Sequence, residues 1–339
     1  MREIQPQTVR ARELYGDFWF NSGPVPLMAL RGQVILIEFW DYTCGRSLHT
    51  LPYMMEWYRK YSPYGLAVVG VHTPKFPFGR DPEQVQRAIA RLGITYPVVM
   101  DNDALIATQY GNRIWPEMFI VDKNGFVRYE AGGEGGYGST EHVLQTLLYD
   151  AGVGEELPAP MAPVREADKA GAVCYRVSPE LFTGYVRGTI GNIEGFSPES
   201  IVAYTDPKIY IDGRFYADGR WRNERSGLRL EEDNRPGHII LDYQAMEVNG
   251  VLRSDGGKDV EVTVRQDDLY LAGNAGGDDI RFAHDGRSYL VVGDPRMYSV
   301  VKNREFGEHV LKLSTEASGL TVFSFMFVSG VIPELISNN

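Results

Sequence analysis

Cys44 is the residue of this chain best suited to covalent chemistry, because of where it stands in the sequence. An apolar run over 34–40 is typical of a buried strand, and a helical pattern begins at Cys44. A half-exposed thiol at the first turn of a helix meets unpaired N–H groups and the positive end of the helix dipole, which favour the thiolate. Thr43 in the N-cap position and Arg46 close by favour it further. We therefore expect a redox or nucleophilic site with a lowered cysteine pKa, and an inert buried thiol is the alternative.

Ser47 lies one helical turn after Cys44, where it can donate its O–H to the sulfur. The alternative is a neutral serine on the helix surface. Without a second thiol, exchange with a disulfide stops at the mixed disulfide until an external thiol arrives. The spacing therefore predicts single-thiol chemistry, and net reduction of a substrate in one turnover is not expected.

Two ionisable residues belong to the predicted strands next to this cysteine. Glu38 lies inside the apolar run, so burial should raise its pKa and let it pass protons near Cys44. A hydrogen-bonded carboxyl with a structural role is the alternative. His72 ends the next predicted strand at the same carboxyl edge, where it could approach the site. A core or loop histidine is the more common situation.

The bulk properties limit the class of protein. A chain of 339 residues suggests two domains, and no apolar run reaches the roughly 20 residues that a membrane helix needs. The net charge of −11 argues against nucleic acid or an anionic membrane as partner. Two cysteines cannot form a disulfide framework, no metal site or cofactor is indicated, and Cys174 is expected to be a small buried thiol. The amino terminus lacks a secretory pattern, which predicts a cytoplasmic chain unless a signal was removed.

Strand and helix patterns alternate over the first half of the chain. Strands are expected at 34–40, 66–71 and 96–100, helices at 44–60, 81–92, 103–110 and 140–149, and a hairpin at 118–122 and 126–130. This order predicts an α/β domain over 1–152, with one mixed sheet and flanking helices.

A change of texture marks a second domain. Residues 153–172 contain several prolines and no sustained apolar period, which predicts a linker. From 173 to 339 the chain shows short alternating segments separated by turn residues, which favour an all-β sandwich of jelly-roll type. The expected strands are 201–204, 208–211, 238–243, 260–264, 269–271, 289–292, 297–301 and 320–328.

Several phrases occur in the order and spacing of one known family. They are Phe39-Trp40 with Cys44 and Ser47, Gly70-Val71-His72-Thr73-Pro74, Tyr96-Pro97, Asn112-Arg113-Ile114-Trp115-Pro116, Gly133-Glu134-Gly135-Gly136-Tyr137, and Ser178-Pro179-Glu180-Leu181-Phe182-Thr183-Gly184-Tyr185. Together they resemble the TlpA/DipZ-type thioredoxin-like proteins, in which a redoxin domain precedes a carbohydrate-binding-module-like β-sandwich. The match covers almost the whole chain, with Cys-x-x-Ser in place of Cys-x-x-Cys.

The resemblance implies a thiol–disulfide oxidoreductase scaffold and a role for each matching residue. Cys44 matches the nucleophile and Ser47 the resolving cysteine, Pro116 the cis-proline beside the site, and Glu38 the buried acid. A cis bond would expose the backbone of Trp115 to an extended substrate, and a trans proline is the alternative. The residues expected to contact substrate are Trp40, Thr43, Gly45, Arg46 and Trp115. Most relatives are extracytoplasmic, which is the expected location if a signal peptide was removed.

Two function classes remain open from the sequence. In the first, Cys44 exchanges thiols and disulfides with protein or small-molecule partners, and an allied version makes it a peroxide-reactive thiol. In the second, the redox site has decayed, and the β-sandwich binds a glycan or a protein partner. Six aromatic residues could form a stacking platform for sugar rings, although aromatics in a sandwich usually belong to the core: Tyr210, Phe215, Tyr216, Trp221, Tyr270 and Tyr298. A Cys44 pKa near 8.5 or higher would favour the second class.

Overall fold

The computed structural model describes residues 4–231 and 235–335. The chain divides into two compact units, Met1–Gly171 and Ala172–Asn339, which are described separately. The first unit therefore takes in nearly all of the segment predicted to be a linker. Residues 1–3, which contribute to the signal-peptide expectation, lie outside the described residues.

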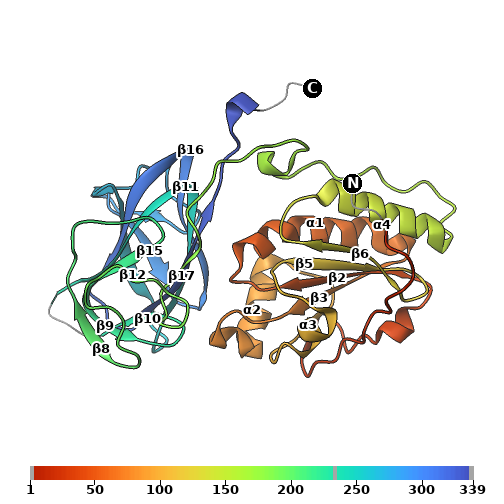
Figure 1. The fold of residues 1–339 in the computed structure, drawn as a ribbon, viewed down its shortest axis with the longest axis horizontal. Helices are drawn as coiled ribbons and strands as arrows, with labels where there is room; N and C mark the ends of the chain where they lie inside the picture. The colour runs from red at the N-terminus through yellow and green to blue at the C-terminus, as the bar shows by residue number, and fades with distance from the viewer. Residues whose placement is uncertain (1–3, 232–234, 336–339) are drawn as a thin grey trace. The chain divides into compact units, whose positions relative to one another are not determined.

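The first unit alternates strands and helices, as the sequence predicts (Figure 1). Its strands are β1 (Trp19–Phe20), β2 (Val34–Trp40), β3 (Leu66–His72), β4 (Val98–Met100), β5 (Glu117–Val121) and β6 (Val127–Gly132). Its α-helices are α1 (Gly45–Tyr61), α2 (Pro82–Leu92), α3 (Leu105–Tyr110) and α4 (Tyr137–Ala151), and short 3-10 turns are η1 (Leu27–Leu30), η2 (Ser62–Tyr64), η3 (Pro77–Arg80) and η4 (Glu166–Asp168).

One mixed sheet organises this unit, which confirms the predicted α/β architecture. The strand order is β1-β4-β3-β2-β5-β6. Strands β2, β3 and β4 run parallel, and β5 runs antiparallel to β2. The carboxyl ends of the three parallel strands and the beginning of β5 therefore meet at one edge of the sheet.

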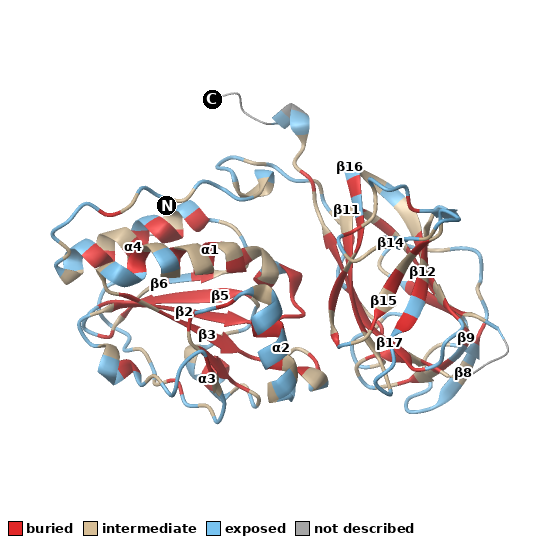
Figure 2. Cartoon of the chain, turned by 180° about the vertical axis from the view of Figure 1, so that it is seen from behind, coloured by how far each residue is buried: buried red, intermediate tan, exposed pale blue. Residues whose placement is uncertain are grey.

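The two faces of the sheet have separate apolar cores. Alternate residues of a strand point to opposite faces, so Leu36 and Trp40 of β2 face one core while Ile37 and Phe39 face the other. The first core includes buried residues of α1, α2 and α4, and the second includes residues of α3 and of the N-terminal segment. Figures 1 and 2 show α1 and α4 side by side, with their buried residues toward the sheet.

Helix α3 begins two residues later than predicted, at Leu105. Ala104 has a left-handed backbone with φ of 54°, so the helix cannot extend through it. The carboxylate of Asp101 accepts hydrogen bonds from the N–H groups of Ile106 and Ala107, both at 2.9 Å, and so stabilises the beginning of the helix.

The segment predicted to be a linker packs on the first unit. Leu157 is buried and Met161 partly buried against the core formed with α1 and α4. Gln145 donates to the carbonyl of Pro158 at 2.9 Å, and the N–H of Met161 donates to Glu141 at 2.8 Å. Apolar burial and these backbone contacts explain why a proline-rich stretch holds a defined path here.

The second unit is all β, as predicted. Its strands are β7 (Leu181–Phe182), β8 (Ile201–Tyr204), β9 (Phe215–Asn223), β10 (Leu228–Leu230), β11 (Gly237–Ser254), β12 (Val260–Gln266), β13 (Leu269–Tyr270), β14 (Arg281–Phe282), β15 (Ser288–Val292), β16 (Arg296–Thr315) and β17 (Leu320–Val328), followed by η5 (Pro333–Leu335). Pairing joins the strands in one 11-stranded sheet. The first part of the long strand β11 pairs with β9 and its last part pairs with β17. The jelly-roll topology and the carbohydrate-binding likeness stay predictions.

Two details of the second unit, at residues 208–211 and at Cys174, differ from the sequence expectations, whereas four of the six aromatic residues lie in the core, as is usual for a sandwich. Residues 208–211, which the structure describes, do not form the predicted strand. Lys208 has φ of 60°, and its N–H donates to Asp206 at 2.9 Å in a local turn. Phe215, Tyr216, Trp221 and Tyr298 are buried, so they cannot form an exposed platform for sugars. Cys174 is exposed rather than buried.

Candidate active site

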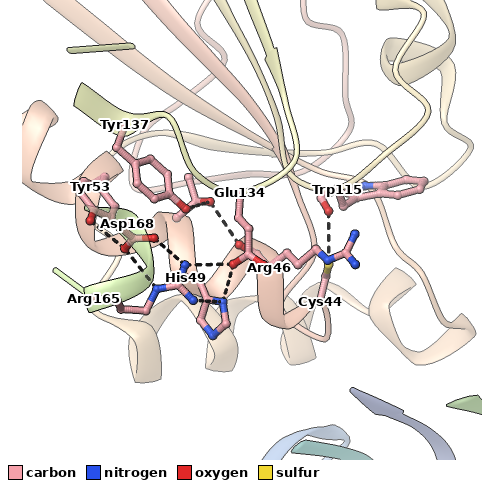
Figure 3. Close-up of polar contacts among 10 residues, drawn as sticks. Cys44, Arg46, His49, Tyr53, Trp115, Glu134, Tyr137, Arg165 and Asp168 are labelled. Atoms are coloured by element: carbon pink, nitrogen blue, oxygen red, sulfur yellow. Dashed lines mark hydrogen bonds and ion pairs between the residues drawn. The ribbon is translucent and has the colours of Figure 1, made fainter. Parts of the chain in front are cut away.

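Cys44 lies where β2 passes into α1, at the sheet edge where β5 begins. It is the N-cap residue of α1, and its carbonyl accepts the N–H of Leu48 at 3.0 Å. Its Sγ is 3.6 Å from the carbonyl oxygen of Trp115, in donor geometry (Figure 3). The Trp115–Pro116 peptide bond is cis, which confirms that prediction. The antiparallel pairing of β5 with β2 is what carries Trp115 to Cys44.

A buried carboxylate organises the turn that presents Cys44. Asp41 is 1% exposed and accepts hydrogen bonds from the N–H and the hydroxyl of Thr43, and from the N–H of Lys75 at 2.7 Å. The N-cap residue of α1 is Cys44, and not Thr43 as the sequence suggested. The hydroxyl of Thr43 donates to Asp41 rather than binding the helix. Asp41 was not singled out from the sequence, although its place directly after a buried strand pointed to it. Its partner Lys75 is 34 positions away in the sequence, so the contact itself could not be foreseen.

Burial raises the pKa of the Cys44 thiol above its ordinary value, so the predicted lowering is wrong. Cys44 is only 7% exposed, and desolvation disfavours the charged thiolate. The positive charge of Lys75, the N–H of Ser47 and, to a smaller extent, the Ser47 hydroxyl lower the Cys44 pKa and partly offset this rise. The negative charge of Asp41 adds to the rise. The expected half-exposed thiol is a nearly enclosed one in the structure.

Ser47 lies under the sulfur rather than on the helix surface. Its side chain is fully buried, and its N–H and hydroxyl both stabilise the thiolate form of Cys44. The Ser47 oxygen also accepts the N–H of Asp41 at 3.4 Å. The residue in the second-cysteine position is thus hydrogen-bonded to the turn that precedes Cys44.

Glu38 is completely buried on the face of β2 that α1 and α4 cover. Burial raises its pKa to about 8, and the nearby hydroxyl of Tyr96 lowers it in part. Neither carboxyl oxygen has a hydrogen bond of normal geometry among the described residues. Its direct neighbour in β3 is Gly70. A side chain at position 70 would collide with Trp40, because a Cβ there would lie 2.9 Å from Nε1 of Trp40. Burial therefore keeps Glu38 mostly uncharged at pH 7.

His72 belongs to the core, which is the interpretation that the sequence favoured. It is fully buried, stacks on Tyr42 at 5.4 Å, and lies 3.7 Å from the Asp41 carboxylate. Burial lowers the pKa of His72, and the negative charges of Asp41 and Asp101 oppose this without reversing it. The ring is therefore neutral at pH 7 and packs behind the Cys44 turn.

Few of the residues expected to contact substrate are accessible. Trp40 and Thr43 are buried, because Trp40 points from β2 into the core shared with α1 and Thr43 faces Asp41. Gly45 is buried in the first turn of the helix. Arg46 is exposed and Trp115 is half-buried, so these two remain able to touch a bound molecule (Figure 3).

A polar network beside the site was not predicted. Nδ1 of His49 is 2.7 Å from Glu134, and Arg165 reaches Glu134 at 3.1 Å and Asp168 at 2.7 Å (Figure 3). Burial would raise the pKa of Glu134, but hydrogen bonds from His49 and Arg165 outweigh it and lower that pKa. Tyr53 of α1 also donates to Asp168 at 2.8 Å. Since Arg165 comes from the segment predicted to be a linker, no sequence pattern pointed to this network.

A metal ion requires a cluster of ligand side chains, and a membrane span requires a long apolar helix. No cluster of three or more His, Cys, Asp or Glu side chains suited to a metal ion occurs in residues 4–231 and 235–335. None of the helices in this described part of the chain is both long and apolar enough to span a membrane.

Comparison with known proteins assigns both units. Residues 17–130 match the AhpC/TSA family, and residues 178–327 match the thioredoxin like C-terminal domain. Protein DipZ of Mycobacterium tuberculosis (strain CDC 1551 / Oshkosh) is 31% identical over 314 residues, which are 91% of this chain and 41% of DipZ. Thiol-disulfide oxidoreductase YkuV of Bacillus subtilis (strain 168) is 32% identical over 125 residues, which are 36% of this chain and 84% of YkuV.

Among solved structures, the thioredoxin-like superfamily protein SPOA0173 aligns with 44% of this chain and 100% of its own length, at 27% identity and a TM-score of 0.40. This score is low, so the assignment rests on the sequence matches and on the strand order described above. The chain spans less than half the length of the DipZ proteins that it matches. With a redoxin domain followed by a thioredoxin like C-terminal domain, it belongs to the TlpA/DipZ-type thioredoxin-like family.

Proposed function

We propose that this protein is a thiol–disulfide oxidoreductase that acts through the single cysteine Cys44. The observation that carries the proposal is the position of Cys44 at the start of α1, with its sulfur 3.6 Å from the Trp115 carbonyl and Ser47 in the place of a second cysteine. Two curated relatives are named thiol-disulfide oxidoreductases, YkuV and ResA. The substrates are protein or small-molecule disulfides and thiols.

The reaction has two exchange steps. The Cys44 thiolate attacks one sulfur of a disulfide, so that a Cys44–substrate disulfide forms, the original S–S bond breaks, and the other half leaves as a thiolate that takes up a proton. An external thiolate then attacks the substrate sulfur, forms a new disulfide with it, and releases the Cys44 thiolate. Each step breaks one S–S bond and forms another, so no other oxidant or reductant is needed.

The neighbouring residues divide the remaining tasks. The N–H and hydroxyl of Ser47 stabilise the thiolate when it forms. The Trp115-Pro116 segment and Arg46 lie at the mouth of the site, where they would contact the extended part of a substrate. Glu38, which is protonated at pH 7, is a proton donor and acceptor on the buried side of the turn.

Glutathione disulfide is expected to add one glutathionyl group to Cys44. The test uses the Cys174→Ser protein, because Cys174 is exposed and would also react. Intact-mass and peptide mass spectrometry should place the adduct on the Cys44 peptide, and reduced glutathione should remove it. The Cys44→Ser, Cys174→Ser protein is the matched control and should gain no mass. If Cys174→Ser gains none either, the proposed activity is wrong.

The raised pKa of Cys44 favours a second candidate, a thioredoxin-fold protein without redox activity that acts through a glycan or a protein bound to its β unit. An unperturbed thiol with a pKa of about 8.5 is roughly 3% thiolate at pH 7, and Cys44 has less. A high pKa slows exchange without preventing it, because a more basic thiolate is also a better nucleophile. Reactivity at Cys44 therefore decides between the two candidates.

The thiolate of Cys44 is expected to form only at alkaline pH. Thiolate absorbance of the Cys174→Ser protein, corrected with Cys44→Ser, Cys174→Ser, should rise with a midpoint above the ordinary value for a free cysteine. The mixed-disulfide rate should follow the same curve. Asp41→Asn should lower the midpoint because it removes a negative charge near the sulfur and keeps one side-chain oxygen as acceptor. A midpoint below 7 in the parent protein would contradict the enclosed site seen here.

A further inference from the structure

The loop 133–136, between β6 and α4, lies against the cis-proline of the Cys44 site. The N–H of Gly133 donates to the Pro116 carbonyl at 2.8 Å, and this is the next carbonyl after the one that faces the Cys44 sulfur. Apart from Glu134 the loop consists of glycines, and all three have left-handed backbones with φ between 67° and 95°. Because glycine backbones are the least restricted, Glu134 supplies the only side chain of the loop that can fix its path.

Glu134 is fastened to two other segments (Figure 3). Its carboxylate lies 2.7 Å from Nδ1 of His49, in the second turn of α1, and 3.1 Å from the guanidinium of Arg165. Arg165 is itself held by Asp168, whose carboxylate accepts from Nε at 3.1 Å and from a terminal nitrogen at 2.7 Å. A bidentate pair of this kind fixes the direction of the guanidinium as well as its position.

The Arg165–Asp168 pair has an anchor of its own on the helices. The side chain of Asp168 is 2% exposed and accepts the Tyr53 hydroxyl of α1 at 2.8 Å. The N–H of Val164 donates to the same hydroxyl at 2.7 Å. The Tyr53 ring stacks on Tyr137 of α4, with centroids 3.7 Å apart. Arg165 therefore does not depend on Glu134 for its position, whereas the loop that carries Glu134 depends on Arg165.

The loop 133–136 is more important for an extended substrate than for a small one. A peptide that reaches the sulfur along the Trp115-Pro116 segment would pass beside Gly133, which is bonded to that segment. Cys44 is only 7% exposed, so the peptide must fit this surface before its disulfide can meet the sulfur. A displacement of the loop by about 1 Å would therefore slow exchange with a peptide, while a small disulfide would still reach Cys44.

We propose that Arg165 is a positioning residue for exchange at Cys44, and that it acts through Glu134 by holding the loop 133–136 against the cis-proline segment where an extended substrate binds. This inference rests on the proposed single-cysteine exchange. It adds a residue from the segment 153–171, which the sequence predicts to be a linker, and it names extended peptides as the substrates that require this residue.

The test compares the rates at which two uncharged disulfides form adducts on Cys44 in the Cys174→Ser protein. One is hydroxyethyl disulfide, which is small enough to meet only the sulfur. The other is a mixed disulfide of 2-mercaptoethanol with an uncharged five-residue peptide that has a central cysteine, and mass spectrometry counts only the adduct that carries the peptide. The ratio of the peptide rate to the hydroxyethyl disulfide rate is the readout, because the thiolate fraction of Cys44 cancels from it.

Arg165→Gln, in the same Cys174→Ser background, should lower this ratio by roughly 10-fold, because the loop loses the contact that holds it beside the peptide. Arg165→Lys keeps the charge but not the bidentate geometry, and should restore part of the loss. Lys169→Gln is the matched control, since it removes a cation from the same segment, at an exposed position paired with Glu166. It should leave the ratio unchanged.

Glu134→Gln leaves the Arg165–Asp168 pair in place and should lower the ratio to a similar extent, so it also serves if Arg165→Gln fails to fold. If Arg165 acts through Glu134, the variant with both substitutions should lose no more than either single variant. A double loss equal to the product of the two single losses would show that Arg165 acts by another route and would overturn the inference.

The remaining outcomes separate the positioning role from the exchange activity. A ratio that stays at the parent value in Arg165→Gln and Glu134→Gln, with adducts still forming on Cys44, overturns the positioning role and leaves the exchange activity standing. Equal slowing of both disulfides overturns it as well, because the effect would then act on the sulfur rather than on the path of the substrate. No adduct with either disulfide in the Cys174→Ser protein refutes the exchange activity itself.

Discussion

Replacing Ser47 by cysteine is expected to convert the Cys44 site from a single-thiol site into a dithiol pair that turns over without a high concentration of external thiol. Ser47 is fully buried one helical turn after Cys44, where its hydroxyl lowers the pKa of the Cys44 thiol, so a sulfur in its place needs only a small movement to reach bonding distance. The second thiol would then resolve the mixed disulfide within the protein. Because an intramolecular nucleophile acts at a far higher effective concentration than millimolar external thiol, reduction of a protein disulfide should accelerate on the order of 100-fold or more.

The measurement has two readouts. Oxidised Ser47→Cys, Cys174→Ser protein should lose two hydrogen atoms in mass and become resistant to alkylation, which reports a bond between Cys44 and the sulfur introduced at position 47. Insulin reduction with a fixed low concentration of dithiothreitol reports turnover. Ser47→Ala, Cys174→Ser controls for loss of the hydroxyl and should stay slow. An internal disulfide without faster turnover would mean that the site does not admit protein disulfides, and the absence of that disulfide would show that position 47 cannot approach Cys44.

The sequence was sufficient for the position of the site, because the position follows from local patterns. Apolar runs over 34–40 and 66–71 become the parallel strands β2 and β3, and the hairpin after 117 becomes β5 and β6. Parallel strands present their carboxyl ends at one edge, which brings together Cys44 after β2 and Lys75 after β3. The burial of Glu38 and the direction of its pKa were predictable for the same reason, since an acid inside an apolar strand is desolvated.

The electrostatics of Cys44 could not be predicted, because they depend on contacts between distant segments. Helix position alone suggested a lowered pKa, but desolvation of a 7% exposed thiol and the carboxylate of Asp41 outweigh the contributions of Lys75 and Ser47. The balance is set by how closely the loops pack, which no local pattern encodes. Similarly, Arg165 lies in a proline-rich stretch, and its binding to Glu134 is visible only once that stretch is folded along the first unit.

Local turn chemistry accounts for the smaller differences between the structure predicted from the sequence and the observed one. Residues 208–211 have the alternation of a strand, but the carboxylate of Asp206 binds both the N–H and the ammonium group of Lys208 at 2.9 and 2.7 Å and holds a turn instead. In the same way Asp41 takes the hydroxyl of Thr43 away from the helix N-terminus. A short polar side chain competes for backbone donors with regular structure, and the sequence does not show which one prevails.

The free energy of unfolding of the parent protein is expected to fall as the pH rises, and Glu38→Gln is expected to prevent this fall. Glu38 has a pKa of about 8 when folded against an ordinary value of 4.5. Between these values the unfolded chain releases the Glu38 proton while the folded chain keeps it, so the unfolded state binds fewer protons and the free energy of unfolding falls with pH. This contribution is fully present below pH 4.5 and is lost by the time the pH has passed about 8. At 1.36 kcal/mol per pH unit the loss amounts to at most about 5 kcal/mol.

Urea unfolding of the parent and of Glu38→Gln at pH 5, 7 and 9 tests this expectation. Tryptophan fluorescence follows the first unit well, because four of the five tryptophans lie in it, namely Trp19, Trp40, Trp57 and Trp115. The glutamine keeps the size of the side chain and cannot ionise, so the difference between the two proteins should grow in favour of Glu38→Gln as the pH rises. Glu155→Gln, which removes an exposed carboxyl, controls for the loss of one charge. Parallel pH curves for the parent and Glu38→Gln would mean that Glu38 ionises in the folded protein at an ordinary pH, and therefore that water or a donor reaches its carboxyl behind the Cys44 turn.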